Sequence, residues 1–359
     1  MMANFWRDKR VFVTGHTGFK GSWLTLWLHL MGAKVSGYSL PAPTNPSLFH
    51  LARLQNCVQT TTGDVRDPKH VAETMAAVQP DIVFHLAAQP LVRDSYVTPL
   101  DTYATNVMGT AHVLEAVRNT PSVRSVVVVT SDKCYENREW LWGYREDDPM
   151  GGHDPYSSSK GAAELVTSAY RRSFFAKDPD NTVGIASVRA GNVIGGGDFA
   201  ADRLIPDFIR ALEKEEPVSI RNPHAVRPWQ FVLEPLSGYL QIGQLLFEQG
   251  GKYAEGWNFG PADTDLQTVS QLCATFNHSL QKNDVAPVEV RLEPQPNAPH
   301  EAAFLRLDIS KARQRLDWIP KMELYTALEL TAQWYAGYLN NEDLRTLSEN
   351  QIAFYQSLT

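Results

Sequence analysis

Short apolar runs alternate with helix-like stretches over the first 190 residues of this 359-residue chain. The runs are rich in β-branched residues, which is typical of strands buried on both faces. Strand–helix–strand connections are right-handed, so this order predicts an α/β fold built on a doubly wound parallel sheet. The expected strands are Val11–Thr14, Lys34–Tyr38, Asp81–Leu86, Val123–Ser131 and Val183–Arg189, and the expected helices are Gly21–Met31, Lys69–Val78, Pro99–Asn119 and Tyr156–Phe175.

A glycine-rich loop joins the first expected strand to the first expected helix. It reads Gly15-His16-Thr17-Gly18-Phe19-Lys20-Gly21, a G-x-x-G-x-x-G pattern. Glycines permit a tight turn and a close backbone approach, so the N-terminus of the helix can face a pyrophosphate. This position after the first strand predicts a dinucleotide site of the Rossmann type.

The residues that usually select the dinucleotide are less informative. The second expected strand runs into Gly37-Tyr38-Ser39-Leu40-Pro41, with no acidic residue for an adenosine ribose and no arginine for a 2′-phosphate. This position therefore does not discriminate between NAD and NADP. Asp64, after a third strand, is either a carboxylate near the adenine amino group or a solvated turn residue.

The chain changes character after Arg189. Prolines and the run Gly195–Gly197 break the alternation, and shorter elements follow. We expect helices at Arg203–Lys214 and Thr268–Gln281, a loop or edge segment at Pro287–Pro299, and a helix at Leu324–Leu339 that closes the chain. Residues 1–190 are therefore expected to form a Rossmann cofactor domain. Residues 191–359 would mainly form a smaller α/β substrate-binding part, with some chain crossing between the two and the ligand in the cleft.

Tyr156 and Lys160 form a Y-x-x-x-K pair on an expected helix, where residues four apart share a face. A phenol has an ordinary pKa of about 10, and nearby cations favour its ionised form. Such a pair can carry a proton to or from a carbinol during hydride transfer. Ser131 follows the expected strand Val126–Thr130 at the edge where a parallel sheet presents its active residues. Together with the glycine loop, these residues make a specific pattern.

Composition excludes several classes of function. There are 33 Lys and Arg against 40 Asp and Glu, a net charge of −7 that argues against a nucleic-acid binder. Three widely spaced cysteines argue against a disulfide scaffold and a cysteine-built zinc site, and no metal is expected. The N-terminus is charged at Arg7–Arg10, and no apolar window suits a membrane span. We expect a soluble cytoplasmic protein.

These residues, with His85-Leu86-Ala87-Ala88-Gln89 and Asn106, resemble the extended short-chain dehydrogenase/reductase family over nearly the whole chain. Within that family the stretch Thr130–Tyr135 is similar to the nucleotide-sugar 4,6-dehydratases, and Asp132 matches their acid. Lys133 stands where most relatives have Glu. That lysine, the glycine loop and Ala190–Asp198 are most similar to the members that act on CDP-glucose. The resemblance implies conversion of CDP-D-glucose to CDP-4-keto-6-deoxy-D-glucose with bound NAD⁺, for 3,6-dideoxyhexose and O-antigen synthesis.

The resemblance also implies roles for individual residues. Tyr156 removes the 4-hydroxyl proton, Ser131 and Lys160 orient the reacting groups, and Asp132 protonates the departing 6-hydroxyl. Lys133 either accepts the carbon-5 proton as a neutral amine, or stays charged and stabilises the enolate while another group takes the proton. Implied cofactor contacts are Gly15, Thr17, Gly18, Phe19, Lys20, Gly21, Asp64, Val65, Leu86, Ala87, Ala88, Gln89, Asn106, Tyr156 and Lys160, and implied substrate contacts are Asn192, Arg203, Arg221, Arg227 and His300.

Other interpretations stay open. The stretches Pro99–Asn119 and Tyr156–Phe175 correspond to helices that pair as a four-helix bundle in family homodimers, although their apolar positions fit an intramolecular core equally well. A nucleotide-sugar 4-epimerase or a reductase would use the same fold, but carbon-4 inversion needs no acid such as Asp132. A non-catalytic dinucleotide sensor would usually lack the pair Tyr156 and Lys160.

Overall fold

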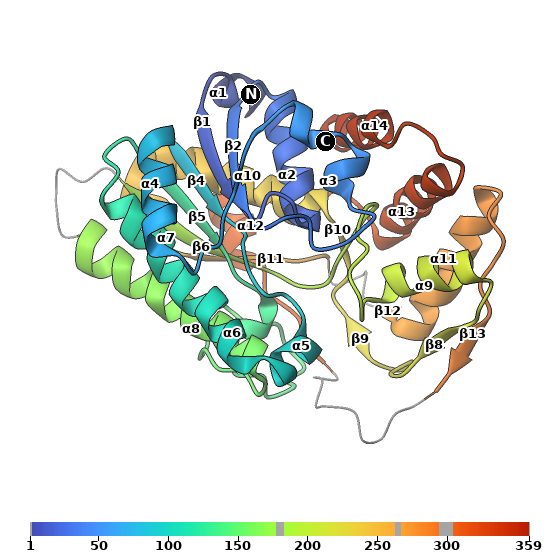
Figure 1. Ribbon diagram of the computed structural model, residues 1–359. Coiled ribbons are helices and arrows are strands. Elements are labelled where there is room, and N and C mark those ends of the chain that lie inside the picture. The colour runs from blue at the N-terminus through green and yellow to red at the C-terminus, as the bar shows by residue number, and fades with distance from the viewer. Residues whose placement is uncertain (1, 177–182, 263–266, 294–303, 359) are drawn as a thin grey trace.

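The computed structural model describes residues 2–176, 183–262, 267–293 and 304–358. A seven-stranded parallel sheet in the order β11-β6-β5-β4-β1-β2-β3 forms its centre (Figure 1). The strand order reverses between β1 and β4, so a crevice opens at the carboxyl ends of these strands. The doubly wound parallel sheet predicted from the sequence is therefore confirmed. The strands are β1 Arg10–Thr14, β2 Lys34–Ser39, β3 Gln59–Thr62, β4 Ile82–His85, β5 Ser125–Val129, β6 Gly184–Ala190 and β11 Gly256–Phe259.

Side chains of the sheet alternate between two apolar cores, one on each face. Along β1, Val11 and Val13 pack into the larger core and Phe12 into the smaller one. Helices α2 (Phe19–Leu30) and α10 (Leu233–Gln249) contribute to the larger core. Helices α4 (Pro68–Val78) and α7 (Gly109–Arg118) contribute to the smaller core, and α8 (Pro155–Tyr170) packs beside α7. Both faces of the sheet are thus covered, as a parallel sheet requires.

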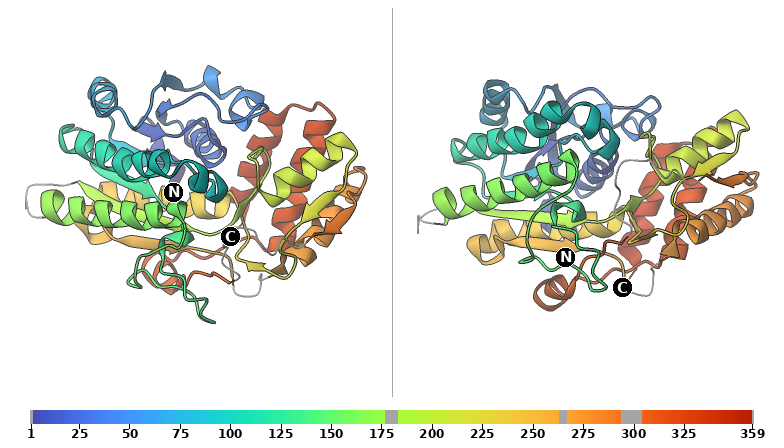
Figure 2. Two further views of the ribbon diagram at one scale, coloured as in Figure 1. Left: turned by 60° about the horizontal axis from the view of Figure 1, so that its bottom comes forward. Right: turned by 90° about the horizontal axis from the view of Figure 1, so that it is seen from below.

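A separate lobe beside the sheet comes from the C-terminal half of the chain, as both views in Figure 2 show. It contains helices α9, α11 and α13 and three small two-stranded sheets. Its elements are β7 Val193–Ile194 with β10 Gln230–Phe231, β8 Val218–Ile220 with β13 Val290–Leu292, β9 Val226–Arg227 with β12 Gln267–Thr268, and the helices α9 Leu204–Lys214, α11 Val269–Lys282 and α13 Leu324–Leu339. The remaining helices are α1 Met2–Trp6, α3 Leu48–Leu51, α5 Val92–Val97, α6 Pro99–Tyr103, α12 Ser310–Leu316 and α14 Leu344–Ser357, with 3-10 turns at Leu54–Asn56, Asp132–Cys134 and Gly250–Tyr253.

The chain crosses back into the sheet after the lobe begins. Helix α10 covers β5 and β6, and β11 pairs in parallel with β6 as the edge strand. The sequence analysis did not predict α10. This helix carries Pro235, Gly238 and Gly243, and because these residue types usually mark turns or loops they weaken a helix prediction.

Two helix predictions need correction. The helix at Leu324–Leu339 does not close the chain, because α14 follows it and begins where the Asp343 carboxylate accepts the backbone N–H groups of Arg345 and Thr346. The stretches Pro99–Asn119 and Tyr156–Phe175 are not uniform α-helices either. Each contains a π-helical turn, at Ala104–Met108 and at Arg171–Phe175. Within the described ranges, no helix has the length and apolar character that crossing a bilayer requires.

Candidate active site

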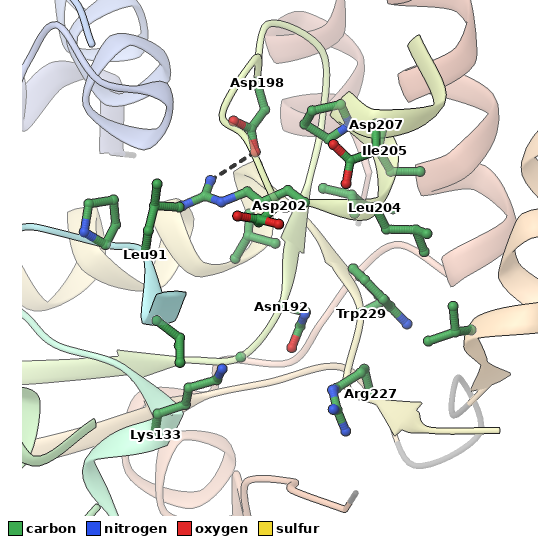
Figure 3. Close-up of a pocket in the computed structure, with 18 of the residues that line it drawn as sticks. Leu91, Lys133, Asn192, Asp198, Asp202, Leu204, Ile205, Asp207, Arg227 and Trp229 are labelled. Carbon is green, nitrogen blue, oxygen red and sulfur yellow. Dashed lines mark hydrogen bonds and ion pairs between the residues drawn. The ribbon is translucent and has the colours of Figure 1, made fainter. Parts of the chain in front are cut away.

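A pocket of about 320 Å³ lies at the carboxyl edge of the sheet, between the sheet and the lobe. Figure 3 shows Lys133, Asn192 and Arg227 on one side of it and the carboxylates of Asp198, Asp202 and Asp207 on the other. The structure brings most of the expected catalytic and substrate residues to this pocket. Its lining includes Phe19, Lys20, Ser131, Asp132, Lys133, Tyr156, Asn192, Arg203, Arg221 and Arg227. His300 lies outside the described residues.

The segment after β5 places an acid next to a hydroxyl. Ser131 caps the 3-10 turn at Asp132–Cys134: its Oγ accepts the backbone N–H of Lys133 at 3.2 Å and donates to Oδ1 of Asp132 at 3.0 Å. Asp132 is only 4% exposed, and this burial raises its pKa, although Lys133, Ser131 and Arg227 oppose the shift. A carboxyl group with a raised pKa can hold a proton and deliver it.

Helix α8 presents Tyr156 and Lys160 one turn apart. The helix begins at Asp154, whose carboxylate accepts the backbone N–H of Ser157, and Pro155 occupies its first turn. Burial raises the pKa of Tyr156 to about 12, and a hydrogen bond with Ser131 opposes that shift. Burial lowers the pKa of Lys160 to about 7, and its Nζ lies 3.4 Å from the carbonyl oxygen of Val129. The phenol and the amine therefore sit in a dry site in which small changes of charge decide where protons reside.

The glycine loop leaves room for backbone only. Gly15 has φ +74°, and a Cβ there would lie 2.7 Å from the backbone nitrogen of Ala87. A Cβ on Gly21 would lie 2.1 Å from the carbonyl oxygen of Gly15. Gly18 is the N-cap of helix α2 and offers no side chain to cap the first backbone N–H groups. These donors can therefore receive an anionic group, so the loop fits the pyrophosphate of a dinucleotide.

Thr17 and the β4–α5 loop are held by side-chain hydrogen bonds. Thr17 Oγ1 lies 2.5 Å from Ser39 Oγ, which ties the glycine loop to the end of β2. The Asn106 amide bonds the backbone N–H and carbonyl of Gln89 at 2.9 and 3.0 Å and also donates to Ser159 of α8 at 2.9 Å. Asn106 lies in the π-helical turn and is 1% exposed, so it serves as a brace between the loop and α8.

The side chains of His85 and Asp64 form hydrogen bonds with other side chains of the protein. His85 ends β4, and its ring bridges the hydroxyls of Thr14 and Thr110 at 2.7 and 3.1 Å. Burial lowers the pKa of His85 to about 3, so the ring is neutral. The Asp64 carboxylate bonds the guanidinium of Arg66 at 2.6 and 2.8 Å, and this hydrogen bonding holds the pKa of Asp64 below its usual value.

Sequence reasoning missed an ion-pair network across the pocket. Asp202, from the lobe, faces Arg93 of α5 and Arg221 of the lobe, each at 3.4 Å. Asp198 pairs with Arg203 at 2.8 Å (Figure 3). A signal for Arg93 was available, because it follows β4 at the same edge of the sheet as Ser131. The acidic partners lie in a loop whose path the sequence does not reveal.

Comparison with known proteins gives a consistent result. Residues 12–331 match the family model described as GDP-mannose 4,6 dehydratase. The chain is 54% identical to the CDP-glucose 4,6-dehydratase of Salmonella typhimurium, over 99% of this chain and 98% of that protein. Among solved structures, it resembles a dTDP-glucose 4,6-dehydratase of Streptomyces venezuelae (TM-score 0.77, 23% identity, 94% and 99% coverage) and a UDP-glucose 4-epimerase of Thermotoga maritima (TM-score 0.76, 22% identity, 92% and 99% coverage). A dehydratase and an epimerase share this fold, so the fold alone does not choose between them.

Proposed function

The chain belongs to the GDP-mannose 4,6-dehydratase family of nucleotide-sugar enzymes, and from this premise we propose that it is a lyase that converts CDP-D-glucose to CDP-4-dehydro-6-deoxy-D-glucose and water. The observation that carries the proposal is the buried acid Asp132 in one pocket with Tyr156. An epimerase acting at carbon 4 does not expel the 6-hydroxyl group, so its reaction needs no acid to protonate that group. The 54% identity to a CDP-glucose enzyme supports the cytidine nucleotide. We assign the product to 3,6-dideoxyhexose synthesis for O-antigen.

The cofactor in this proposal is NAD⁺. The bare backbone around Gly15 and Gly21 fits the pyrophosphate, with Gly18, Phe19 and Lys20 beside it. When bound, NAD⁺ would supply the hydride acceptor for carbon 4 of the sugar and, in its reduced form, the hydride donor for carbon 6. The other residues assigned to it are Thr17, Asp64 and Val65 toward the adenosine, and Leu86, Ala87, Ala88, Gln89, Asn106, Tyr156 and Lys160 toward the nicotinamide ribose.

Proton transfers are assigned to the buried residues of the pocket. Tyr156 accepts the proton of the 4-hydroxyl, and the adjacent Ser131 hydroxyl favours its ionised form. The ketone formed at carbon 4 acidifies the hydrogen on carbon 5. Asp132 then protonates the departing 6-hydroxyl, and the raised pKa of its carboxyl group suits that role.

Lys133 fits two chemistries. As a neutral amine it would accept the carbon-5 proton. As an ammonium it would stabilise the negative charge of the enolate while another group takes that proton. Its side chain is half-buried in the pocket lining, and its charge acts on Asp132 beside it. Replacements that keep or remove the charge separate the two roles.

Local cations are assigned to the diphosphate. The chain carries a net charge of −7, so its overall field does not attract an anionic substrate. Asn192, Arg203, Arg221 and Arg227 come from the C-terminal half of the chain and line the pocket, and guanidinium groups suit phosphate oxygens. We assign the sugar to the sheet side and the nucleotide to the lobe, in line with a cofactor domain over residues 1–190 and a mainly substrate-binding part over 191–359.

We also propose a homodimer that pairs through a four-helix bundle. Leu100 of α6 is 82% exposed, Leu165 of α8 is 62% exposed and Met108 is 51% exposed. Helices α6 and α8 lie side by side, joined by a hydrogen bond of 2.6 Å between Tyr103 and Ser158. Two adjacent helices with exposed apolar residues suit the same pair from a second copy. The three free thiols of the chain agree with a reducing compartment such as the cytoplasm.

A parallel assay with two substrates tests the function. The protein and NAD⁺ are incubated with CDP-glucose and, separately, with dTDP-glucose, and the alkali-induced absorbance of a 4-keto-6-deoxy product is followed. We expect product from CDP-glucose alone. Asp132→Asn should lower kcat by about 10²–10⁴-fold, and the exposed Asp147→Asn serves as the matched control. Absence of product from both sugars, with NAD⁺ bound, would refute the dehydratase proposal.

A further inference from the structure

Glu164 is a buried carboxylate that none of the proposed reaction steps uses. It lies on α8, one turn after Lys160 and two turns after Tyr156, and is 4% exposed. Both of its oxygens bind Arg189 of β6: Nε donates to Oε1 and Nη2 to Oε2, each at 2.8 Å. Thr130 donates to Oε1 at 2.5 Å and Ser187 donates to Oε2 at 2.6 Å. The carboxylate thus accepts four hydrogen bonds, three from β6 and one from Thr130 directly after β5.

The partners of Glu164 hold both ends of the segment that carries the catalytic acid. Thr130 directly precedes Ser131. At the other end, Arg189 Nη1 donates to the Tyr135 hydroxyl at 2.5 Å, and Tyr135 donates to Asn258 Oδ1 of β11 at 2.8 Å. One ion pair therefore connects α8, which presents Tyr156 and Lys160, to the segment Ser131–Tyr135.

A buried ion pair of this kind contributes little net stability compared with a well-packed apolar pair, because both charges lose their hydration. The pair instead fixes the relative orientation of the two side chains, because a bidentate guanidinium–carboxylate contact requires a specific geometry. A displacement of about 1 Å between reacting groups is enough to slow an enzyme substantially. The main effect expected of these hydrogen bonds is therefore on the relative position of α8 and the segment Ser131–Tyr135, and not on stability.

We propose that Glu164 is a positioning residue, which fixes the register of α8 against the segment Ser131–Tyr135 so that the Tyr156 phenol faces Ser131 and Asp132. It acts through Thr130 and Arg189 and does not touch the pocket, whose lining includes Thr130 but not Glu164. The inference rests on the proposed dehydration for its kinetic test. The structural part of the inference, that Glu164 fixes the position of α8, depends only on the hydrogen bonds described above.

Two variants of Thr130 test the connection with minimal disturbance. Thr130→Val keeps the shape and leaves the Glu164–Arg189 pair intact, but it removes the donor to Glu164 along with a weaker contact to the carbonyl oxygen of Val188 at 3.3 Å. Thr130→Ser restores the hydroxyl. We expect Thr130→Val to lower kcat about tenfold with KM for CDP-glucose within about twofold, and Thr130→Ser to recover most of the loss.

Glu164→Gln tests the charge itself. It should lower kcat about 100-fold with little change in KM. Glu164 also raises the pKa of Lys160, so the Lys160 limb of the pH–rate profile should move to lower pH in this variant. The matched control is Glu115→Gln, which breaks an exposed pair with Arg118 on α7 and should leave kcat, KM and the profile unchanged.

Hydrogen–deuterium exchange of the whole protein keeps this test independent of the substrate. We expect faster exchange in residues 131–135 and 155–165 of Thr130→Val and Glu164→Gln, and not in Glu115→Gln. Unchanged exchange in both variants, or a kinetic loss confined to KM, would overturn the positioning role. If wild-type protein is inactive with both sugars, the proposed function fails while the exchange data still decide the role of Glu164.

Discussion

Ser131 Oγ donates to Oδ1 of Asp132 at 3.0 Å, and that hydrogen bond lowers the pKa of a carboxyl group that burial raises. Ser131→Ala should therefore raise the pKa of Asp132 further. It should also remove the hydroxyl that favours ionisation of Tyr156. We expect kcat to fall by about 10²-fold and the limb of the pH–rate profile that reports Asp132 to move to higher pH. Ser131→Thr, which keeps a hydroxyl, should keep the wild-type profile.

Two substitutions can distinguish the two roles proposed for Lys133. Lys133→Met removes both charge and base, and we expect product formation to fall by at least about 100-fold. Lys133→Arg keeps a cation that cannot act as a base near neutral pH. Retained activity in the arginine variant identifies an enolate-stabilising cation, whereas a loss equal to that of the methionine variant identifies a base. Incorporation of solvent deuterium at carbon 5 is the direct measurement.

Arg227 should act on binding more than on chemistry. Its side chain is 9% exposed and lines the lobe side of the pocket. Arg227→Met should raise KM for CDP-glucose by about 10–100-fold, the loss of one charged hydrogen-bonding partner, with a smaller change in kcat. Arg291→Met serves as the control, because Arg291 is exposed on strand β13 and pairs with its neighbour Glu289. Equal effects of the two substitutions would remove Arg227 from the binding site.

The proposed dimer can be tested by a charge on its apolar face. Leu165→Glu places a carboxylate in the expected bundle and should convert the dimer to a monomer in light scattering coupled to size-exclusion chromatography. Leu141→Glu is the control, since Leu141 is 83% exposed in the loop between the 3-10 turn Asp132–Cys134 and α8 and belongs to neither α6 nor α8. A monomer in the wild type, or a dimer in both variants, would contradict the bundle.

A buried carboxylate in α10 should make stability depend on pH. Glu234 accepts the backbone N–H groups of Lys321 and Met322 and the hydroxyl of Tyr355, and burial raises its pKa from 4.5 to about 7. The folded protein therefore holds a proton that the unfolded chain releases between about pH 4.5 and pH 7, so this group's stabilisation is complete below pH 4.5 and is lost as pH rises through that window. The loss is about 3 kcal/mol.

Glu234→Gln should remove that dependence while keeping the acceptor for the two backbone groups. We expect the difference in unfolding free energy between wild type and variant to shift in favour of the variant from pH 5 to pH 7.5, as measured by urea unfolding. Glu329→Gln, on the surface of α13 beside Lys282, provides the comparison. A constant difference across this range would show that Glu234 is ionised throughout.

The sequence predicted those parts of the fold in which local pattern and tertiary position agree. Strands β1, β2, β4, β5 and β6 and the helices α2, α4, α8, α9, α11 and α13 were expected close to their observed bounds, whereas β3 was expected without bounds. Helix α10 was not expected, because Pro235, Gly238 and Gly243 lie within it and are residue types that usually mark turns or loops. The π-helical turn at Ala104–Met108 also leaves no trace in the apolar spacing, although it carries Asn106.

The same distinction between local pattern and tertiary position applies to the residues of the candidate site. Ser131 and the Tyr156–Lys160 pair follow from strand ends and helical spacing, which are local properties. The pairing of Arg93 with Asp202 joins residues 109 positions apart through a loop without a regular period. The Glu164–Arg189 pair is likewise invisible, because only the packing of α8 on β6 shows that these charges meet.

Strand β11 has a consequence for how the molecule can be divided. It supplies the edge of the sheet beside β6, and it arrives only after the chain has already built the lobe strands β7–β10. A fragment that ends near residue 190 would leave β6 as a bare edge with unpaired N–H and carbonyl groups, a template for aggregation. Neither wall of the pocket is therefore formed by one continuous stretch of chain. A lobe moved from one enzyme to another must be inserted so that the recipient keeps its own strand β11 at the edge of its sheet.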